Sequence, residues 1–236
     1  MALYSYTKNK KTPLRRFLSA LSFLFIFSGI LILIWVLYPI LAFQFYYSPK
    51  FATLMRPVSE ADESENLAAN LYRSLSSNFI DYTRASVWFP KAESVKLSDN
   101  LNNYSLSIPR LAIKDAFVEI GGDDLAKSLI HFTGPKPGQI GNPVIFGHST
   151  LLWFYNPSDY KSIFSKLPEL EENNEIIIES DKVFYTYRIY EMFITSPTDL
   201  SVLNQTDKEE ILTLVTCVPP GTYLKRFIVK ARLVKV

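Results

Sequence analysis

The stretch that decides the fold is ILTLVTCVPPGTYLKRFIVKARLVK, residues 211–235. It holds two runs rich in Ile, Leu and Val, at 211–217 and 227–235, on either side of a loop with Pro and Gly. Such runs are typical of β-strands. The distance from Cys217 to Arg226 lets the second strand turn back and pair antiparallel with the first. We therefore expect two adjacent strands joined by a short loop.

Six more strand candidates precede this pair, separated by Pro, Gly and Asn. They lie at 104–109, 116–121, 128–133, 142–148, 174–180 and 183–195. Eight short strands in one segment predict a mainly β fold, a closed or nearly closed eight-stranded β-barrel with short helices. Helical spacing of Tyr160, Ile163, Phe164 and Leu167 predicts a helix over 159–170. Residues 206–210 are expected to form one helical turn, with Thr206 as its cap.

An uncharged stretch near the N-terminus, FLSALSFLFIFSGILILIWVLY, runs from Phe17 to Tyr38. As a helix it would be about 33 Å long, enough to cross a hydrocarbon core of about 30 Å. It is longer than the apolar part of a signal peptide and lacks a small-residue cleavage site, so we favour an uncleaved transmembrane anchor over residues 17–40. Five basic residues precede it, which predicts a cytoplasmic tail at 1–16 and an extracellular body. The expected location is the cell membrane, with a single pass.

Residues 41–103 are expected to form a juxtamembrane helix and a linker ahead of the barrel at 104–236. Leu67, Leu71, Leu75 and Phe79 recur every fourth residue, which predicts an amphipathic helix over 59–86. Residues 87–103 are mixed and polar and are interpreted as the linker.

Composition excludes several classes of protein. One Cys and two His are too few for a disulfide scaffold or a zinc ribbon. The net charge of +2 divides into five basic residues before Phe17 and a body of net charge −3, which gives nucleic-acid binding little support. No cofactor or metal is expected. Catalysis by a thiol with an imidazole would have to use Cys217 with His131 or His148.

Position along the chain favours one set of candidate catalytic residues. Cys217 ends a strand beside the VPPG loop, where we expect an activated thiol open to a groove; a buried, inert Cys is the alternative. His148 likewise ends the run PVIFGH, whereas His131 lies inside SLIHFT and is interpreted as structural. Arg226 opens the last strand and could stabilise an oxyanion beside Cys217. Lys225 competes for this role, because strand alternation turns only one of the two inward.

These residues together resemble the sortases, membrane-anchored cysteine transpeptidases of the bacterial cell surface. The resemblance rests on TLVTC (213–217), RFIVKA (226–231) and NPVIFGHS (142–149), with support from SIPRLAI (107–113), PGQIGN (137–142) and SPTDLSVL (196–203). It covers about residues 104–236, the tail and the anchor. Asn173 and Asn174 stand where many members have Gly-Asp, and Ser149 where some have Arg. The subclass stays open, with a class D- or E-like member considered.

The resemblance implies His148, Cys217 and Arg226 as catalytic residues and removes His131 from consideration. The implied activity is cleavage of a Leu-Pro-x-Thr-Gly-like sorting signal between Thr and Gly, through a thioester on Cys217. The implied partners are surface proteins that carry the signal and an amine of a peptidoglycan precursor or a pilin. The alternative is a membrane-tethered β-barrel that binds a peptide without turning it over. A transpeptidase that cross-links peptidoglycan directly fits less well, because its His and Cys are usually close together in one motif.

Overall fold

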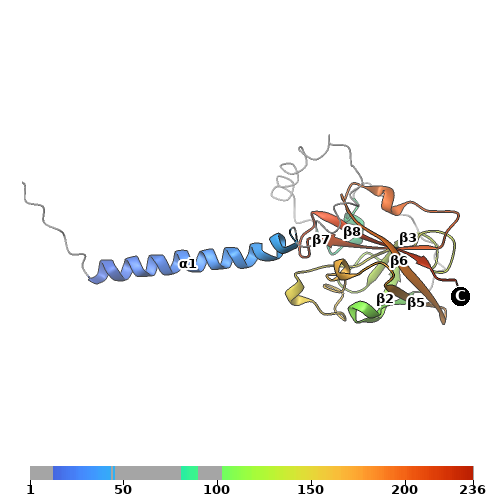
Figure 1. Ribbon diagram of the computed structural model, residues 1–236, viewed down its shortest axis with the longest axis horizontal. Helices are drawn as coiled ribbons and strands as arrows, with labels where there is room; N and C mark the ends of the chain where they lie inside the picture. Colours follow the sequence, from blue (N-terminus) through green and yellow to red (C-terminus); the bar gives the residue numbers. More distant parts are fainter. Residues whose placement is uncertain (1–12, 44, 46–80, 90–102, 236) are drawn as a thin grey trace, which may run out of the picture. The chain divides into compact units, whose positions relative to one another are not determined.

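The computed structural model describes residues 13–43, 45, 81–89 and 103–235. The chain divides into two compact units, and the boundary in the sequence lies between Leu41 and Ala42. The first unit is dominated by α1 (Pro13–Ala42), which has no acidic residue in its first turn and is almost wholly apolar (Figure 1). Its segment Phe17–Tyr38 is long and apolar enough to cross a membrane. The helix expected over 59–86 and the linker over 87–103 lie mostly outside the described residues.

The second unit is built on a closed barrel of eight strands, in the order β1-β2-β3-β4-β7-β8-β6-β5 (Figure 1). This confirms the mainly β barrel and each of the eight expected strands. Their bounds are β1 Tyr104–Ile108, β2 Ile113–Ile120, β3 Leu129–Thr133, β4 Val144–Phe146, β5 Glu175–Ser180, β6 Val183–Thr195, β7 Ile211–Val218 and β8 Lys225–Leu233. The pairs β2–β3 and β4–β7 are parallel, and all other neighbours are antiparallel.

Two apolar clusters stabilise the barrel. One takes side chains from all eight strands and fills the interior. The second lies on the other face of β3, β4, β6, β7 and β8. Alternation along β7 feeds both clusters, with Leu212 and Leu214 in the first and Val215 and Cys217 in the second. Because β7 is buried on both faces, its sequence is a nearly continuous apolar run.

Residues 81–89, called the N-terminal arm below, cover part of the second cluster. The arm contains the short 3-10 helix η3 (Ala85–Val87), and its Trp88 and Phe89 side chains are fully buried. Its backbone is bonded to the loop between β2 and β3, because Ala85 N donates to Asp123 O and Leu125 N donates to Thr83 O. Residues 81–89 were expected to belong to the helix over 59–86 and to the linker. In the structure they are instead part of the folded unit.

Two expected helical segments are wrong. Residues 159–170 form a series of turns that ends in η6 (Leu167–Glu169), although Ile163, Phe164 and Leu167 are buried as the spacing predicted. The α-helix does not form because the amide of Phe164 donates to His148 O, 3.1 Å away, and not to the residue four positions back. Residues 206–210 form a bend, and the helical turn lies earlier, in η7 (Leu200–Leu203), capped by Asp199.

The turn before β5 explains one departure from the sortase pattern. Asn173 has a φ of 69°, in the left-handed region that Gly adopts freely and Asn tolerates better than most residues. Asn can therefore serve where many relatives have Gly.

His131 predicts a loss of stability at acidic pH. Its ring is buried, with Nδ1 2.9 Å from the Tyr104 hydroxyl and Nε2 3.2 Å from Gly134 O, and burial lowers its pKa to about 4. A pKa below its unfolded value means that stability is complete above about pH 6.5 and falls as the pH drops toward 4, by about 3 kcal/mol. Urea unfolding of the full-length protein in detergent should show this loss, and His131→Gln should reduce it. The same pH dependence in both proteins would contradict the assignment.

Candidate active site

The register of β7 and β8 places Cys217 directly opposite Arg226. Both residues are about 1% exposed, whereas Lys225 is exposed. Of the two basic residues at the start of β8, Arg226 is thus the one that faces the thiol.

Three hydrogen bonds join the β4 segment to β7 and bring His148 to the same end of the barrel. The Thr213 hydroxyl donates to Asn142 Oδ1 at 2.7 Å, and the Thr216 hydroxyl donates to Gly147 O at 2.8 Å. The Ser149 hydroxyl then donates to the carbonyl of Cys217 at 2.7 Å. His148 lies between two residues bonded to the Cys217 region, so its position follows that of the thiol.

His148 is partly exposed, and its neighbours fix its ring. Nδ1 donates to Ser149 O at 2.9 Å, which leaves the lone pair of the neutral imidazole on Nε2. Burial lowers the pKa of His148, and hydrogen bonds to the carbonyls of Ser149 and Lys161 act against that shift. A Cβ on Gly147 would lie 2.2 Å from the Phe164 ring, so only Gly fits beneath that ring. The absence of a side chain at Gly147 therefore lets the Phe164 ring lie close to the backbone.

The Cys217 thiol is buried, and the expectation of an exposed nucleophile is wrong. Its side chain belongs to the second cluster, because Trp88, Phe89 and Val215 pack into the same layer. Burial raises the pKa of Cys217 to about 11, and the positive charge of Arg226 acts to lower it. At pH 7 this leaves about one thiolate in 10⁴ molecules. A buried Cys was the alternative to an exposed thiol, and the arm that contributes to this burial was interpreted as helix and linker.

Two tyrosines lie beside the candidate residues. Tyr223, in the loop between β7 and β8, meets the His148 ring edge-on, with ring centroids 6.4 Å apart. The ring of Tyr82, from the N-terminal arm, stacks on Tyr223 at 3.9 Å. The arm thus reaches the same loop that separates Cys217 from Arg226. The sequence did not indicate a place near the candidate residues for either tyrosine, since neither lies in a motif.

His131 lies apart from this group. Its bonds to Tyr104 and Gly134 place it on β3, facing the barrel interior. The structure therefore brings together His148, Cys217 and Arg226 and leaves out His131.

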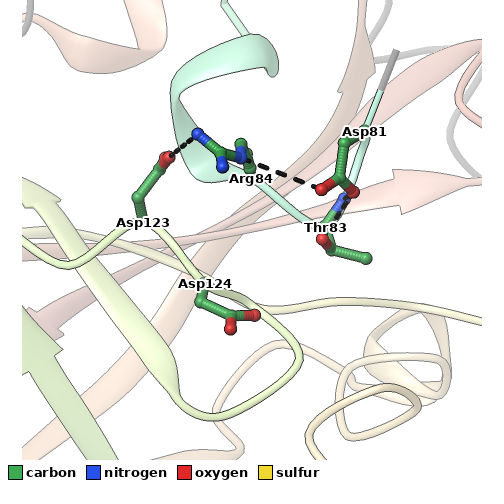
Figure 2. A pocket seen from close by; sticks show the side chains of 5 residues that line it. All are labelled: Asp81, Thr83, Arg84, Asp123 and Asp124. Carbon is green, nitrogen blue, oxygen red and sulfur yellow. Dashed lines mark hydrogen bonds and ion pairs between the residues drawn. The ribbon is translucent and has the colours of Figure 1, made fainter. Parts of the chain in front are cut away.

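A surface hollow of about 270 Å³ lies at the arm, lined by Asp81, Thr83, Arg84, Asp123 and Asp124 (Figure 2). Arg84 forms ion pairs with Asp81 and Asp123, and Lys127 pairs with Asp124. Hydrogen bonds from the hydroxyl and the amide of Thr83, with a smaller contribution from Arg84, lower the pKa of Asp81, and the bond from Lys127 lowers the pKa of Asp124. Because its charges are already paired, the hollow is a joint between the arm and the barrel and shows no catalytic geometry.

Comparison with known proteins identifies the family. The sequence matches the Sortase domain over residues 106–234, and the chain belongs to the sortase family, whose members are transpeptidases. No curated protein matches the chain.

Among solved structures, sortase A from Corynebacterium diphtheriae superposes on this chain with a TM-score of 0.53 and 21% sequence identity. The superposed region covers 83% of this chain and 92% of the sortase A chain. A sortase D5 transpeptidase from Clostridium perfringens is 29% identical over 58% of this chain and 84% of its own, with a TM-score of 0.49. A sortase E variant from Streptomyces avermitilis is 28% identical over 56% and 87%, with a TM-score of 0.46.

The buried thiol predicts slow alkylation at neutral pH. Because the thiolate is the reactive form, iodoacetamide labelling of Cys217 should accelerate about tenfold per pH unit between pH 7 and 10. Arg226→Gln removes the charge that favours the thiolate and should slow labelling further, whereas Lys225→Gln, at an exposed position, should not. The rates are read by intact-protein mass spectrometry. Rapid labelling that is independent of pH between 6 and 8 would contradict the assignment.

Proposed function

We propose that this sortase cleaves a Leu-Pro-x-Thr-Gly-like sorting signal between Thr and Gly, with Cys217 as nucleophile, His148 as general acid and base, and Arg226 as oxyanion donor. The observation that supports it most is the cross-strand pair of Cys217 and Arg226, with His148 tied to the same strand end by its neighbours. A thiol and a guanidinium from β7 and β8, with an imidazole from the segment that follows β4, meet the needs of acyl transfer.

In the proposed reaction the Cys217 thiolate attacks the Thr carbonyl carbon and gives a tetrahedral oxyanion. Arg226 donates a hydrogen bond to that oxyanion, at a buried site where such a bond is worth more than in water. The bond between carbon and nitrogen breaks as His148 gives its proton to the leaving Gly amine. The result is a thioester, which conserves the acyl bond energy. An incoming amine then attacks it, His148 accepts the amine proton, and the thiolate leaves.

Protonation sets the requirement for starting this reaction. In the structure, burial raises the pKa of Cys217 and lowers that of His148, so the neutral pair predominates. Since burial is the largest cause of both shifts, a movement that admits substrate and water to the thiol would favour the charged pair. The enzyme would therefore react through a minor protonation state, and opening of the site would increase its population.

The proposed partners follow from the reaction. The acyl donors are surface proteins with a C-terminal sorting signal, and the acceptor is an amine of a peptidoglycan precursor or a pilin. The apolar segment Phe17–Tyr38 would anchor the enzyme in the cell membrane, with the tail at 1–16 in the cytoplasm and the catalytic domain at 104–236 outside.

The thioester gives the first test of this function. Full-length protein in detergent, mixed with a Leu-Pro-x-Thr-Gly peptide, should gain the mass of the acyl fragment, and Cys217→Ala should not. Labelling that persists in Cys217→Ala would contradict the assignment of the nucleophile. Binding of the peptide without any acyl-enzyme would favour the non-catalytic β-barrel.

The oxyanion role of Arg226 gives a second test. Lys keeps the positive charge but loses the planar fork, so Arg226→Lys should lower the rate of peptide cleavage by roughly 10²- to 10³-fold. Lys225→Gln is the matched control and should cleave at the normal rate. If Arg226→Lys kept near-normal turnover, Arg226 would not be the oxyanion donor.

A further inference from the structure

The hydrogen bonds of Arg226 use two of its three guanidinium nitrogens. Nη2 donates to Trp88 O at 2.8 Å, and Nη1 donates to Tyr223 O at 3.2 Å and to Lys225 O at 3.3 Å. Nε is buried and has no hydrogen-bond partner among the described residues. A buried donor without a partner is costly, and such donors often mark the place where a ligand completes the site.

The faces of two aromatic rings enclose the same guanidinium. Cζ of Arg226 lies 5.3 Å from the Trp88 ring centroid and 5.9 Å from that of Phe89. Both rings are fully buried, so the electrostatic attraction between a cation and a ring face is not screened by water. No carboxylate pairs with Arg226 in the described part of the chain. Its charge is thus held in place without being neutralised.

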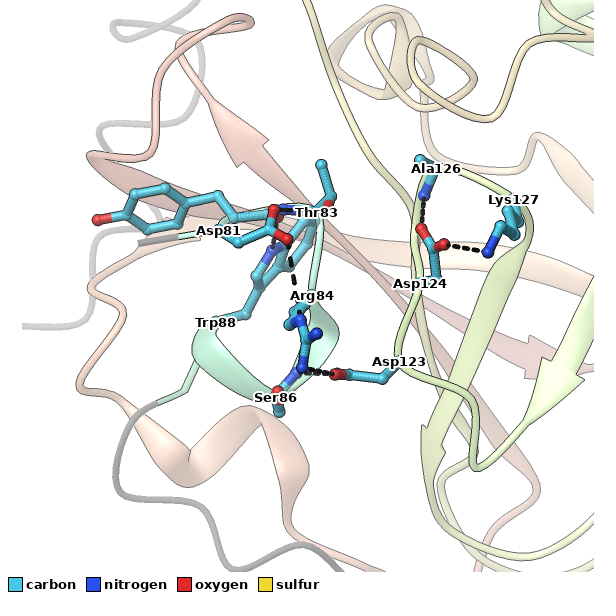
Figure 3. A network of polar contacts seen from close by, with 10 residues as sticks. Asp81, Thr83, Arg84, Ser86, Trp88, Asp123, Asp124, Ala126 and Lys127 are labelled. Atoms are coloured by element: carbon cyan, nitrogen blue, oxygen red, sulfur yellow. Dashed lines mark hydrogen bonds and ion pairs between the residues drawn. The ribbon is translucent and has the colours of Figure 1, made fainter. Parts of the chain in front are cut away.

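The N-terminal arm is anchored independently of Arg226. Within the arm, Trp88 Nε1 donates to Tyr82 O at 2.9 Å. The arm is joined to the loop between β2 and β3 by Ser86 N, which donates to Asp123 Oδ1 at 2.8 Å (Figure 3). The Trp88 ring also stacks on Phe146 of β4, with centroids 5.3 Å apart. These contacts hold the Trp88 ring through groups other than the guanidinium of Arg226. The arm is therefore able to impose an orientation on Arg226.

We infer that Trp88 and Phe89 are positioning residues for Arg226, which hold its guanidinium so that Nε–H, on the nitrogen that has no partner among the described residues, is the donor offered to the acyl oxygen of the substrate. This inference rests on the function proposed above for Arg226. It assigns part of the active site to residues 88 and 89, outside the span matched by the Sortase domain. The arm acts on the reaction through Arg226, in addition to packing in the same cluster as Cys217.

A double-mutant cycle in the full-length enzyme tests the inference. Trp88→Leu removes the ring but keeps the backbone carbonyl, and should lower kcat for peptide transfer about tenfold while KM changes less than about twofold. In the Arg226→Lys background, Trp88→Leu should cost less than about twofold, because there is no guanidinium left to orient. Trp88→Phe should restore most of kcat. Equal losses in both backgrounds, or no loss in either, would overturn the inference.

Phe132→Leu is the matched control. The Phe132 ring stacks on Phe146 at 4.6 Å, in the same cluster as Trp88, yet no contact joins it to Arg226. It should lower the thermal midpoint and leave kcat unchanged. If Trp88→Leu does not fold, Phe89→Leu takes its place in the cycle, with the same expected signs and the same contrary result.

A measurement that needs no turnover separates this inference from the proposed function. The Nε–H resonance of Arg226, observed by ¹⁵N NMR, should be protected from water and shifted by the ring currents of Trp88 and Phe89. In Trp88→Leu it should exchange faster and lose the shift. If no acyl-enzyme forms while the resonance behaves this way, the proposed function fails, whereas the orientation of the Arg226 guanidinium by Trp88 and Phe89 stands. An unprotected resonance in the wild-type protein would overturn the positioning role itself.

Discussion

The parallel pairing of β4 with β7 is the constraint on which the rest of the site depends. Three side-chain hydrogen bonds join the two segments, from Thr213 to Asn142, from Thr216 to Gly147 and from Ser149 to Cys217. Parallel strands have no hairpin to set their register, so these buried bonds, each worth about 1 kcal/mol, specify it together with the backbone ladder. Once the register is set, His148 and Cys217 lie at the same end of the barrel.

Burial of Cys217 and Arg226 is the second constraint, because the packing that stabilises the barrel also makes the thiol less reactive. The cluster that stabilises β7 and β8 also takes Cys217 and Arg226 out of water, which raises the pKa of the thiol. No carboxylate pairs with Arg226 among the residues that the structure describes. In the role proposed for Arg226, this arrangement would hold the oxyanion donor in a dry site, at the expense of thiolate population. The N-terminal arm contributes Ala85, Trp88 and Phe89 to the cluster that contains Cys217.

The eight strands could be predicted because their apolar runs are short, rich in Ile and Val, and separated by Pro, Gly and Asn. Strand alternation reduced the basic residue that faces Cys217 to a choice between Lys225 and Arg226. The structure shows that it is Arg226. The sequence left an exposed and a buried Cys217 as alternatives, since Trp88 and Phe89, which pack in the same cluster, come from a segment distant in sequence and without periodic pattern. Residues 159–170 had helical spacing but formed turns, because His148 O took the amide of Phe164.

The most direct test of the proposed active site is a structure of the enzyme trapped as a covalent adduct between Cys217 and a Leu-Pro-x-Thr analogue. In that adduct the acyl oxygen should accept a hydrogen bond from Arg226 Nε, while Nη2 stays bonded to Trp88 O and Nε2 of His148 faces the leaving-group side. An acyl oxygen turned away from Arg226, with Nε still unpaired or with Lys225 in its place, would contradict it.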